Sequence, residues 1–271
     1  MKKTRLLALL YLLSLLLLVA SGSLSGALSQ AVYILSFILP VVLGIYIVQR
    51  EQGEDCESLL SLDSRSLGLL LPTIAPIVFV VILTSLLTSF LIEVIFGAQN
   101  VVQVGDNLLI AILSHAILPA VLEEALYRYL PMRLWGKERD ATLVVISSLF
   151  FALVHRDFFV IPYAFLAGAL FMIMDILTES IWPSVILHAV NNTLSVVWIF
   201  YSESTDFAIA FYLSLAMLSL VSLIFVFLRR REYLAGIKKL FCGERLVLGG
   251  EIWYLAVPTL ILAAVNLAAK I

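Results

Sequence analysis

Nine apolar stretches, most of them about 20 residues long, follow one another along the chain and carry few charges. A helix of that length crosses a bilayer, whereas an open sheet in lipid would leave backbone groups unbonded. The chain is 62% hydrophobic and 13% charged, which excludes a water-soluble enzyme and a disordered chain. We therefore expect an all-α, polytopic transmembrane helical bundle of about nine spans. The expected spans are residues 6–27, 31–49, 69–96, 107–134, 141–157, 158–177, 181–200, 207–228 and 252–269.

The basic residues are distributed unevenly between the loops of this topology. If the N-terminus is cytoplasmic and the spans alternate, 14 of the 17 Lys and Arg residues lie on the cytoplasmic side and two on the outer side. Cytoplasmic loops of membrane proteins carry such an excess, so the split indicates this orientation. The predicted cytoplasmic residues are Lys2, Lys3, Arg5, Arg50, Arg65, Arg133, Lys137, Arg139, Arg229, Arg230, Arg231, Lys238, Lys239 and Arg245. The predicted outer residues are Arg156 and Lys270.

Other features of the composition narrow the possible classes further. The net charge of −2 offers no attraction to polyanions, so no nucleic-acid partner is expected. Cys56 and Cys242 lie in polar connectors and provide no disulfide framework. The first span resembles a signal peptide, because basic residues precede a leucine run and small residues follow it, but its length favours a retained helix. Residues 50–68 are expected to form a short amphipathic helix along the cytoplasmic interface.

A few ionisable or amide side chains fall inside the predicted spans. Each buried ionisable group costs at least about 2.5 kcal/mol, so such groups face protein or water and become functional candidates. The candidates are His115, Glu123, Glu124, Arg128, His155, Asp175, His188, Asn191 and Asn192. Asp175 is expected near a cytoplasmic helix end, where it can reach the interface. His115 is interpreted as a packing residue or an outer hydrogen-bonding residue.

The fourth span carries two adjacent glutamates. Glu124 and Arg128 are four residues apart and can pair on one face of a helix. Neighbouring residues point about 100° apart, so Glu123 must face another partner. Pro119 is expected to kink this helix one turn before Glu123.

The fifth and seventh spans each carry a histidine with a companion residue one turn away. Phe151 can pack beneath His155, and His188 shares a face with Asn192, with Asn191 a less favoured alternative. Counted from the cytoplasmic helix ends, Glu123, His155 and His188 lie at roughly 16, 21 and 10 Å, so bringing them together requires tilt or a deeper fifth helix.

This set of side chains suits the hydrolysis of an amide bond. A glutamate in an apolar site can act as general base, and a neutral histidine can position the attacking water. A second histidine and a carboxamide can donate to the oxyanion. Glu123, His155, His188 and Asn192 match these roles.

Three motifs in this order resemble the CAAX protease and bacteriocin-processing (CPBP) family, which includes the type II CAAX prenyl endopeptidases. They are E-E-x-x-x-R at 123–128, F-x-x-x-H at 151–155 and H-x-x-x-N at 188–192. The resemblance implies an intramembrane endopeptidase in which Glu123 and His155 activate water and His188 with Asn192 forms the oxyanion site. Glu124, Arg128 and Phe151 would be supporting residues.

Together, the spans, the charge distribution and the resemblance predict a division of the chain and a cellular setting. Residues 1–106 would be N-terminal transmembrane helices with a cytoplasmic connector, 107–200 the catalytic core, and 201–271 C-terminal transmembrane helices. The expected location is the plasma membrane of a prokaryote, with the N-terminus cytoplasmic. The expected partners are the lipid bilayer and a membrane-associated peptide or protein substrate.

Several alternatives remain open. A metal is not expected, although Glu123, His155 and His188 could bind Zn²⁺; no H-E-x-x-H motif is present and asparagine is a poor zinc ligand. A rhomboid-like serine mechanism could use Ser148, which shares a face with His155. The alternative from another class is a non-catalytic membrane protein, for bacteriocin immunity, partner binding or transport, that uses the same fold.

Overall fold

The computed structural model describes residues 3–52, 59–98, 104–136, 139–241 and 253–271. Within these segments all regular secondary structure is helical, and turns and irregular residues connect the helices. The long helices are α1 (Lys3–Gly22), α2 (Gly26–Gln52), α3 (Ser64–Phe96), α8 (Ile161–Thr178), α9 (Trp182–Tyr201) and α10 (Thr205–Leu228). Shorter helices are α7 (Ala141–Leu153), α11 (Arg230–Phe241) and α12 (Trp253–Ala268). One further long helical stretch is subdivided into α4 (Leu108–Ile112), η1 (Leu113–Ile117), α5 (Leu118–Glu124), η2 (Ala125–Tyr129) and α6 (Leu130–Trp135).

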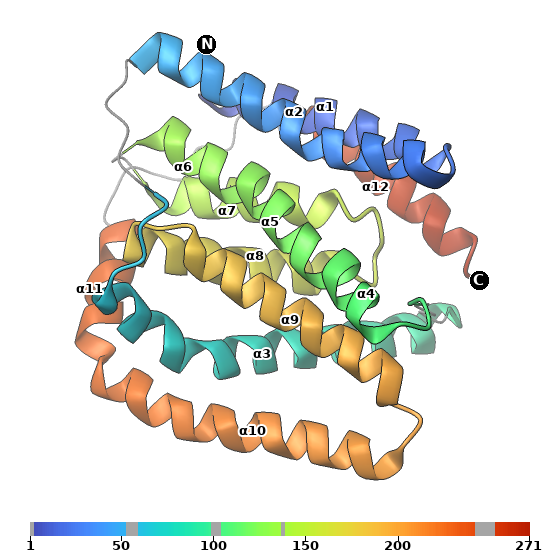
Figure 1. The fold of residues 1–271 in the computed structure, drawn as a ribbon, viewed down its shortest axis with the longest axis vertical. Helices are drawn as coiled ribbons and strands as arrows, with labels where there is room; N and C mark the ends of the chain where they lie inside the picture. The colour runs from blue at the N-terminus through green and yellow to red at the C-terminus, as the bar shows by residue number, and fades with distance from the viewer. Residues whose placement is uncertain (1–2, 53–58, 99–103, 137–138, 242–252) are drawn as a thin grey trace.

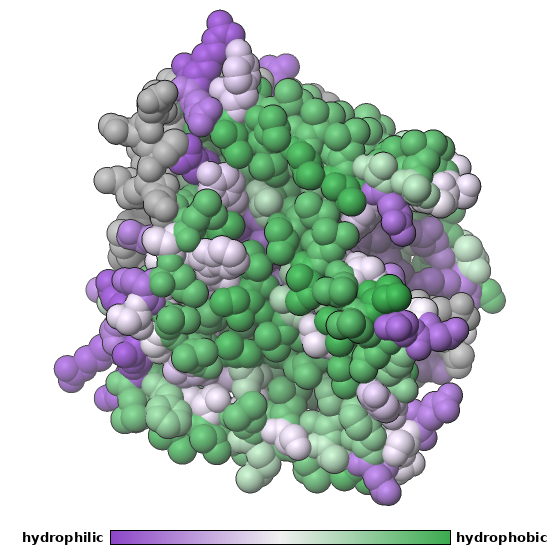
Figure 2. Space-filling model, viewed as in Figure 1, coloured by the Kyte–Doolittle hydropathy of each residue, from purple (hydrophilic) through white to green (hydrophobic). Residues whose placement is uncertain are grey.

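Seven helical stretches of the described residues are long and apolar enough to cross a membrane. The apolar helices Ala141–Leu153 and Ala256–Ala268 are shorter, so a count of nine full spans is not confirmed. Hydrophobic residues cover the middle of the molecular surface, and hydrophilic residues gather toward its left and right edges (Figure 2). The all-α polytopic membrane fold predicted from the sequence is confirmed.

The bundle is built from pairs of neighbouring antiparallel helices (Figure 1). Helices α1 and α2 form a hairpin, α7 packs on α8, and α3 packs on both α8 and α10. The stretch 108–135 lies against α9. Close approach of α7 and α8 depends on Gly168, because a Cβ there would lie 3.1 Å from the Cα of Ser148 and 3.2 Å from the ring of Phe151.

The fifth apolar stretch ends earlier than predicted. Helix α7 ends at Leu153, and the chain turns through His155 to Asp157. Arg156 has a positive φ of 53°, and Asp157 accepts a hydrogen bond from the N–H of Phe159 at 2.9 Å. Because Phe158, Phe159 and Val160 are apolar, the sequence pattern around this polar turn reads as one continuous apolar run. His155 therefore lies in a connection and not within a span.

The connector 50–68 also differs from the expected amphipathic helix. Helix α2 runs on to Gln52, residues 59–63 are not helical, and positions 53–58 lie outside the described residues. Asp63 caps α3 by accepting from the N–H of Ser66 at 2.7 Å. Hydrogen bonds from the side chain and the backbone N–H of Ser66 lower the pKa of the Asp63 carboxyl. The amphipathic helix is instead α11, where the hydroxyl of buried Tyr233 donates to the carbonyl of Leu69 at 2.6 Å.

Two prolines shape the long stretch 108–135. A proline has no N–H, so Pro119 and Pro131 cannot bond the carbonyls of His115 and Tyr127, their partners in an α-helix. Each proline follows a π-helical segment, in which Leu118 N–H bonds Leu113 and Leu130 N–H bonds Ala125, five residues back. Such segments are frequent at functional sites. The π-helical segment Leu113–Ile117 precedes Pro119, where a kink was predicted, and the two glutamates lie between the two segments.

Candidate functional site

Glu124 forms the buried centre of a three-residue polar cluster. Its Oε2 lies 3.2 Å from the Nε of Arg128, and neither side chain is exposed to solvent. Its Oε1 lies 2.7 Å from the Nδ1 of His188. Because a carboxylate only accepts, His188 carries its proton on Nδ1 and donates to Glu124. The Glu124–Arg128 pair follows the predicted helical spacing, and the bond to His188 adds a contact that the spacing does not indicate.

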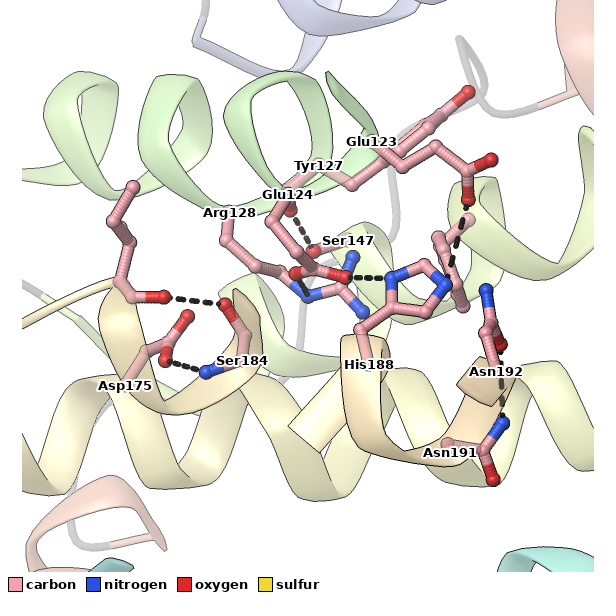
Figure 3. A network of polar contacts seen from close by, with 12 residues as sticks. Glu123, Glu124, Tyr127, Arg128, Ser147, Asp175, Ser184, His188, Asn191 and Asn192 are labelled. Atoms are coloured by element: carbon pink, nitrogen blue, oxygen red, sulfur yellow. Dashed lines mark hydrogen bonds and ion pairs between the residues drawn. The ribbon is translucent and has the colours of Figure 1, made fainter. Parts of the chain in front are cut away.

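Glu123 faces the other side of the same histidine. Its Oε2 lies 4.0 Å from the Nε2 of His188, and its side chain is 12% exposed. That oxygen has no hydrogen-bond partner among the described residues. The separation is too long for a direct hydrogen bond and suits a bridging water. The two adjacent glutamates thus flank the two ring nitrogens of His188 (Figure 3).

The ring of Phe151 packs against both His155 and His188. Its ring centroid lies 5.2 Å from that of His155 and 5.5 Å from that of His188, with both pairs edge-on. The guanidinium of Arg128 lies over the same ring, 4.4 Å from the centroid. His155 donates through Nδ1 to the carbonyl of Phe151 at 2.8 Å, which leaves Nε2 available. The predicted packing of Phe151 on His155 is confirmed.

Asn192 and Asn191 lie one turn beyond His188 on α9. Asn192 donates through Nδ2 to the carbonyl of His115 at 3.5 Å, a long and weak bond. Its Oδ1 accepts from Nδ2 of Asn191 at 3.2 Å. Asn191 is buried, and its own Oδ1 has no partner among the described residues. The carbonyl of His115 is free to accept because Pro119 cannot bond it.

Asp175 belongs to a second buried polar group beside this cluster, and its position differs from the prediction. Asp175 is fully buried and does not reach the interface. Its Oδ1 accepts from the N–H of Ser184 at 2.9 Å in the first turn of α9 (Figure 3). A helix start leaves N–H groups unbonded, so Asp175 of α8 caps α9 from a neighbouring helix. This role depends on helix contacts, which the apolar pattern around Asp175 does not reveal.

The functional candidates share one cavity of about 1130 Å³. Its lining includes six of the polar candidates: His115, Glu123, His155, His188, Asn191 and Asn192. Glu123, His155 and His188, whose expected depths along the helix axes differ, therefore line the same cavity. Glu124 and Arg128 are not part of the lining and lie behind His188.

Ser147, Ser184 and Asn191 are polar neighbours of the site that sequence reasoning missed or ranked low. Buried Ser147 of α7 donates to the carbonyl of Tyr127, which Pro131 leaves unbonded. Pro131, four residues after Tyr127, was the available sequence signal for a carbonyl that needs a partner. Ser148 donates to the carbonyl of Val144 in its own helix at 2.6 Å and is buried. That arrangement gives no support to a serine nucleophile.

The fit of the site to zinc can be tested on its donor atoms. Ligand atoms around a tetrahedral zinc lie about 3.3 Å apart. The 4.0 Å between Glu123 Oε2 and His188 Nε2 exceeds this spacing. Among the described residues, no three His, Cys, Asp or Glu side chains gather closely enough to hold a metal ion. As placed here, these two donor atoms lie farther apart than two ligands of one zinc ion, so the arrangement gives no support to the zinc site of Glu123, His155 and His188.

Comparison with known proteins identifies the central part of the chain. Residues 105–194 match the family model described as type II CAAX prenyl endopeptidase Rce1-like. No curated protein and no solved structure matches the chain. The match spans about a third of the sequence and contains all three motifs. It confirms the family resemblance that the motifs predicted and supports a protease family for this segment.

Proposed function

We propose, starting from the Rce1-like assignment of residues 105–194, that this chain is an intramembrane endopeptidase that hydrolyses a peptide bond of a membrane-associated substrate. One observation carries the proposal: Oε2 of the cavity-lining Glu123, which has no hydrogen-bond partner among the described residues, lies 4.0 Å from His188 Nε2. This is the spacing at which one water can contact both groups.

Glu123 is the proposed general base. Its carboxylate takes a proton from water while the water oxygen attacks the scissile carbonyl carbon. The protonated carboxyl then gives the proton to the leaving nitrogen as the carbon–nitrogen bond breaks. His155 is the second proposed water-binding group, because its Nδ1–H is held by the carbonyl of Phe151 and Nε2 remains to accept.

His188 and Asn192 are the proposed oxyanion donors. The weak bond from Asn192 Nδ2 to the carbonyl of His115 is readily exchanged for a stronger one to an oxyanion. His188 is proposed to donate through Nε2 in its doubly protonated form, while its Nδ1–H stays bonded to Glu124. Preorganised donors of this kind typically contribute roughly 10²–10³-fold each to kcat. Hydrolysis is proposed to proceed without a metal.

The orientation is proposed from the charge distribution. The excess of basic residues at one end of the bundle favours a cytoplasmic N-terminus. The plasma membrane of a prokaryote remains a prediction. The division into N-terminal helices 1–106, a catalytic core 107–200 and C-terminal helices 201–271 also remains a prediction.

Replacing Glu123 by Gln tests the proposed function. We expect loss of cleavage by about 10²–10⁴-fold, since general-base catalysis contributes that much. The measurement is quantitative proteomics of cells with wild-type or Glu123→Gln protein, in which an uncut membrane peptide should accumulate in the variant. Glu93→Gln makes the same change at an exposed position outside the cavity and should behave as wild type. Wild-type cleavage by a well-expressed Glu123→Gln protein would favour the non-catalytic alternative.

A further inference from the structure

The cavity occupies only one half of the helix bundle. At one end it reaches the helix ends on either side of the α1–α2 turn (Ser21 of α1 and Ser29 of α2), the segment before α4 (Val104), and the residue after α9 (Ser202). We call this the open end. None of the described connecting residues at the opposite end, 59–63, 136, 139–140, 179–181 and 229, contributes to the lining.

The opposite end is closed by buried side chains. Glu124, Arg128, Asp175 and Ser184 are each fully buried, and they lie between His188 and the start of α9. Apolar residues fill the space around this polar layer; among them Leu126, Leu130 and Met132 have no exposed surface. Within the described residues, the cavity is therefore closed toward this end, and the proposed active site is reached from the half of the bundle that contains the open end.

The two ends also differ in charge. The closed end carries most of the described basic residues: Lys3, Arg5, Arg50, Arg65, Arg133, Arg139, Arg229, Arg230, Arg231 and Lys238. It includes α11, seen at the left of Figure 1. The open end has Arg156 and Lys270, and Lys270 is paired with Asp157 at 2.6 Å. An excess of Lys and Arg marks the cytoplasmic ends of membrane helices, so the closed end is the cytoplasmic one.

We infer that substrate enters the cavity from the extracytoplasmic side of the membrane. The substrate is then a membrane-associated peptide whose scissile bond is presented from the outer surface, and not a cytosolic protein tail. This inference rests on the proposed function, because it takes the molecule that enters the cavity to be a substrate. The direction in which the cavity opens does not depend on catalysis.

Cysteine labelling tests the direction of opening. Cys56 and Cys242 are replaced by Ser, and single cysteines are introduced as Ser202→Cys at the cavity rim and Ser114→Cys within its lining. Arg231→Cys, exposed on α11, reports the closed end. With a membrane-impermeant maleimide, the first two variants should be labelled in intact spheroplasts, and Arg231→Cys only after lysis. Ser202→Cys protected until lysis, or Arg231→Cys labelled in intact spheroplasts, would overturn the inference.

A second measurement locates the cleaved bonds. New peptide termini that are present with wild-type protein and lost in Glu123→Gln should map to the outer side of membrane anchors. Termini on the cytoplasmic side would contradict entry from outside. An absence of any Glu123-dependent terminus would contradict the proposed function instead, and the labelling result would stand independently because it requires no turnover.

Discussion

At the scale of single residues, the candidate site shows how two neighbouring glutamates acquire different roles. Glu124 is fully buried, forms an ion pair with Arg128 and accepts a hydrogen bond from His188, so its charge lies next to a cation. Glu123 faces the cavity with an oxygen that no described residue bonds. The 100° between consecutive helical positions produces this difference. Glu124 is therefore suited to holding Arg128 and His188 in place, and Glu123 to the proposed activation of water.

Glu124→Gln should destabilise the protein much more than Glu123→Gln. The change leaves the buried guanidinium of Arg128 without its counter-charge, a loss of about 3–5 kcal/mol in buried pairs. Glu123 is partly exposed and carries no such pair. The measurement is thermal unfolding in detergent of both variants beside wild type. Equal stability of the two variants would argue against a supporting role for Glu124.

Individual contacts were predictable where the partners lie four residues apart in the sequence. The pairs Glu124–Arg128 and Phe151–His155 follow from their spacing of four. The contact of His188 with both glutamates joins α9 to the stretch 108–135, and no local pattern encodes which residue of one helix meets another. The capping of α9 by Asp175 was missed for the same reason.

At the scale of helices, Pro119 and Pro131 determine which partners the long stretch 108–135 can take. Each proline leaves one backbone carbonyl without its α-helical donor. Asn192 of α9 bonds the carbonyl of His115, and Ser147 of α7 bonds that of Tyr127. The helix with the glutamates is thereby tied to the helix with His188 and Asn192 and to the helix that precedes His155.

Ser147→Ala should lower the stability of the protein while Ser148→Ala should not. Removing the Ser147 hydroxyl leaves the buried carbonyl of Tyr127 unsatisfied, which costs about 1–3 kcal/mol. Ser148 is equally buried but bonds within its own helix. Chemical or thermal unfolding of the two variants measures the difference. Loss of cleavage in Ser148→Ala with unchanged stability would revive the serine mechanism.

The connection that holds His155 is tied to helix α12. Asn266 donates through Nδ2 to the carbonyl of Arg156 at 2.7 Å, and Lys270 pairs with Asp157 at 2.6 Å. Because Arg156 and Asp157 directly follow His155, these bonds restrain the imidazole. Sequence reasoning placed His155 inside a helix, since the apolar run continues past the turn, and it found no role for α12.

Asn266→Ala should lower kcat with little change in KM or stability. The lost hydrogen bond contributes only about 0.5–1.5 kcal/mol to folding, whereas a slightly displaced His155 holds water less well. Steady-state kinetics on a cleaved peptide and thermal unfolding measure the two effects. The matched control is Val265→Ala, the exposed neighbouring position, which should match wild type. A change in stability alone, with normal kcat, would limit Asn266 to a structural role.

At the scale of the whole molecule, hydropathy was sufficient to predict the architecture. The long apolar runs predicted an all-helical membrane bundle because lipid permits few alternatives. The number of full spans was less predictable, because α7 and Ala256–Ala268 are apolar but short. Their lengths depend on packing against neighbours, which hydropathy does not report.

Removal of metal ions should leave cleavage by the intact protein unchanged. The proposed reaction uses a carboxylate, two imidazoles and a carboxamide, and the spacing of Glu123 and His188 does not fit a common zinc ion. Cleavage is measured before and after treatment with 1,10-phenanthroline, together with metal analysis of the purified protein. Inhibition that added Zn²⁺ reverses would refute the metal-free mechanism.

The buried layer behind His188 has a consequence for the cell as well as for the reaction. A large hollow in a membrane protein could conduct protons and small ions, and so dissipate the gradients on which the cell depends. The hollow here ends at Glu124, Arg128, Asp175 and Ser184, none of which water reaches. A buried layer of this kind would allow the proposed reaction to draw water from one side of the membrane while limiting the passage of ions through the protein.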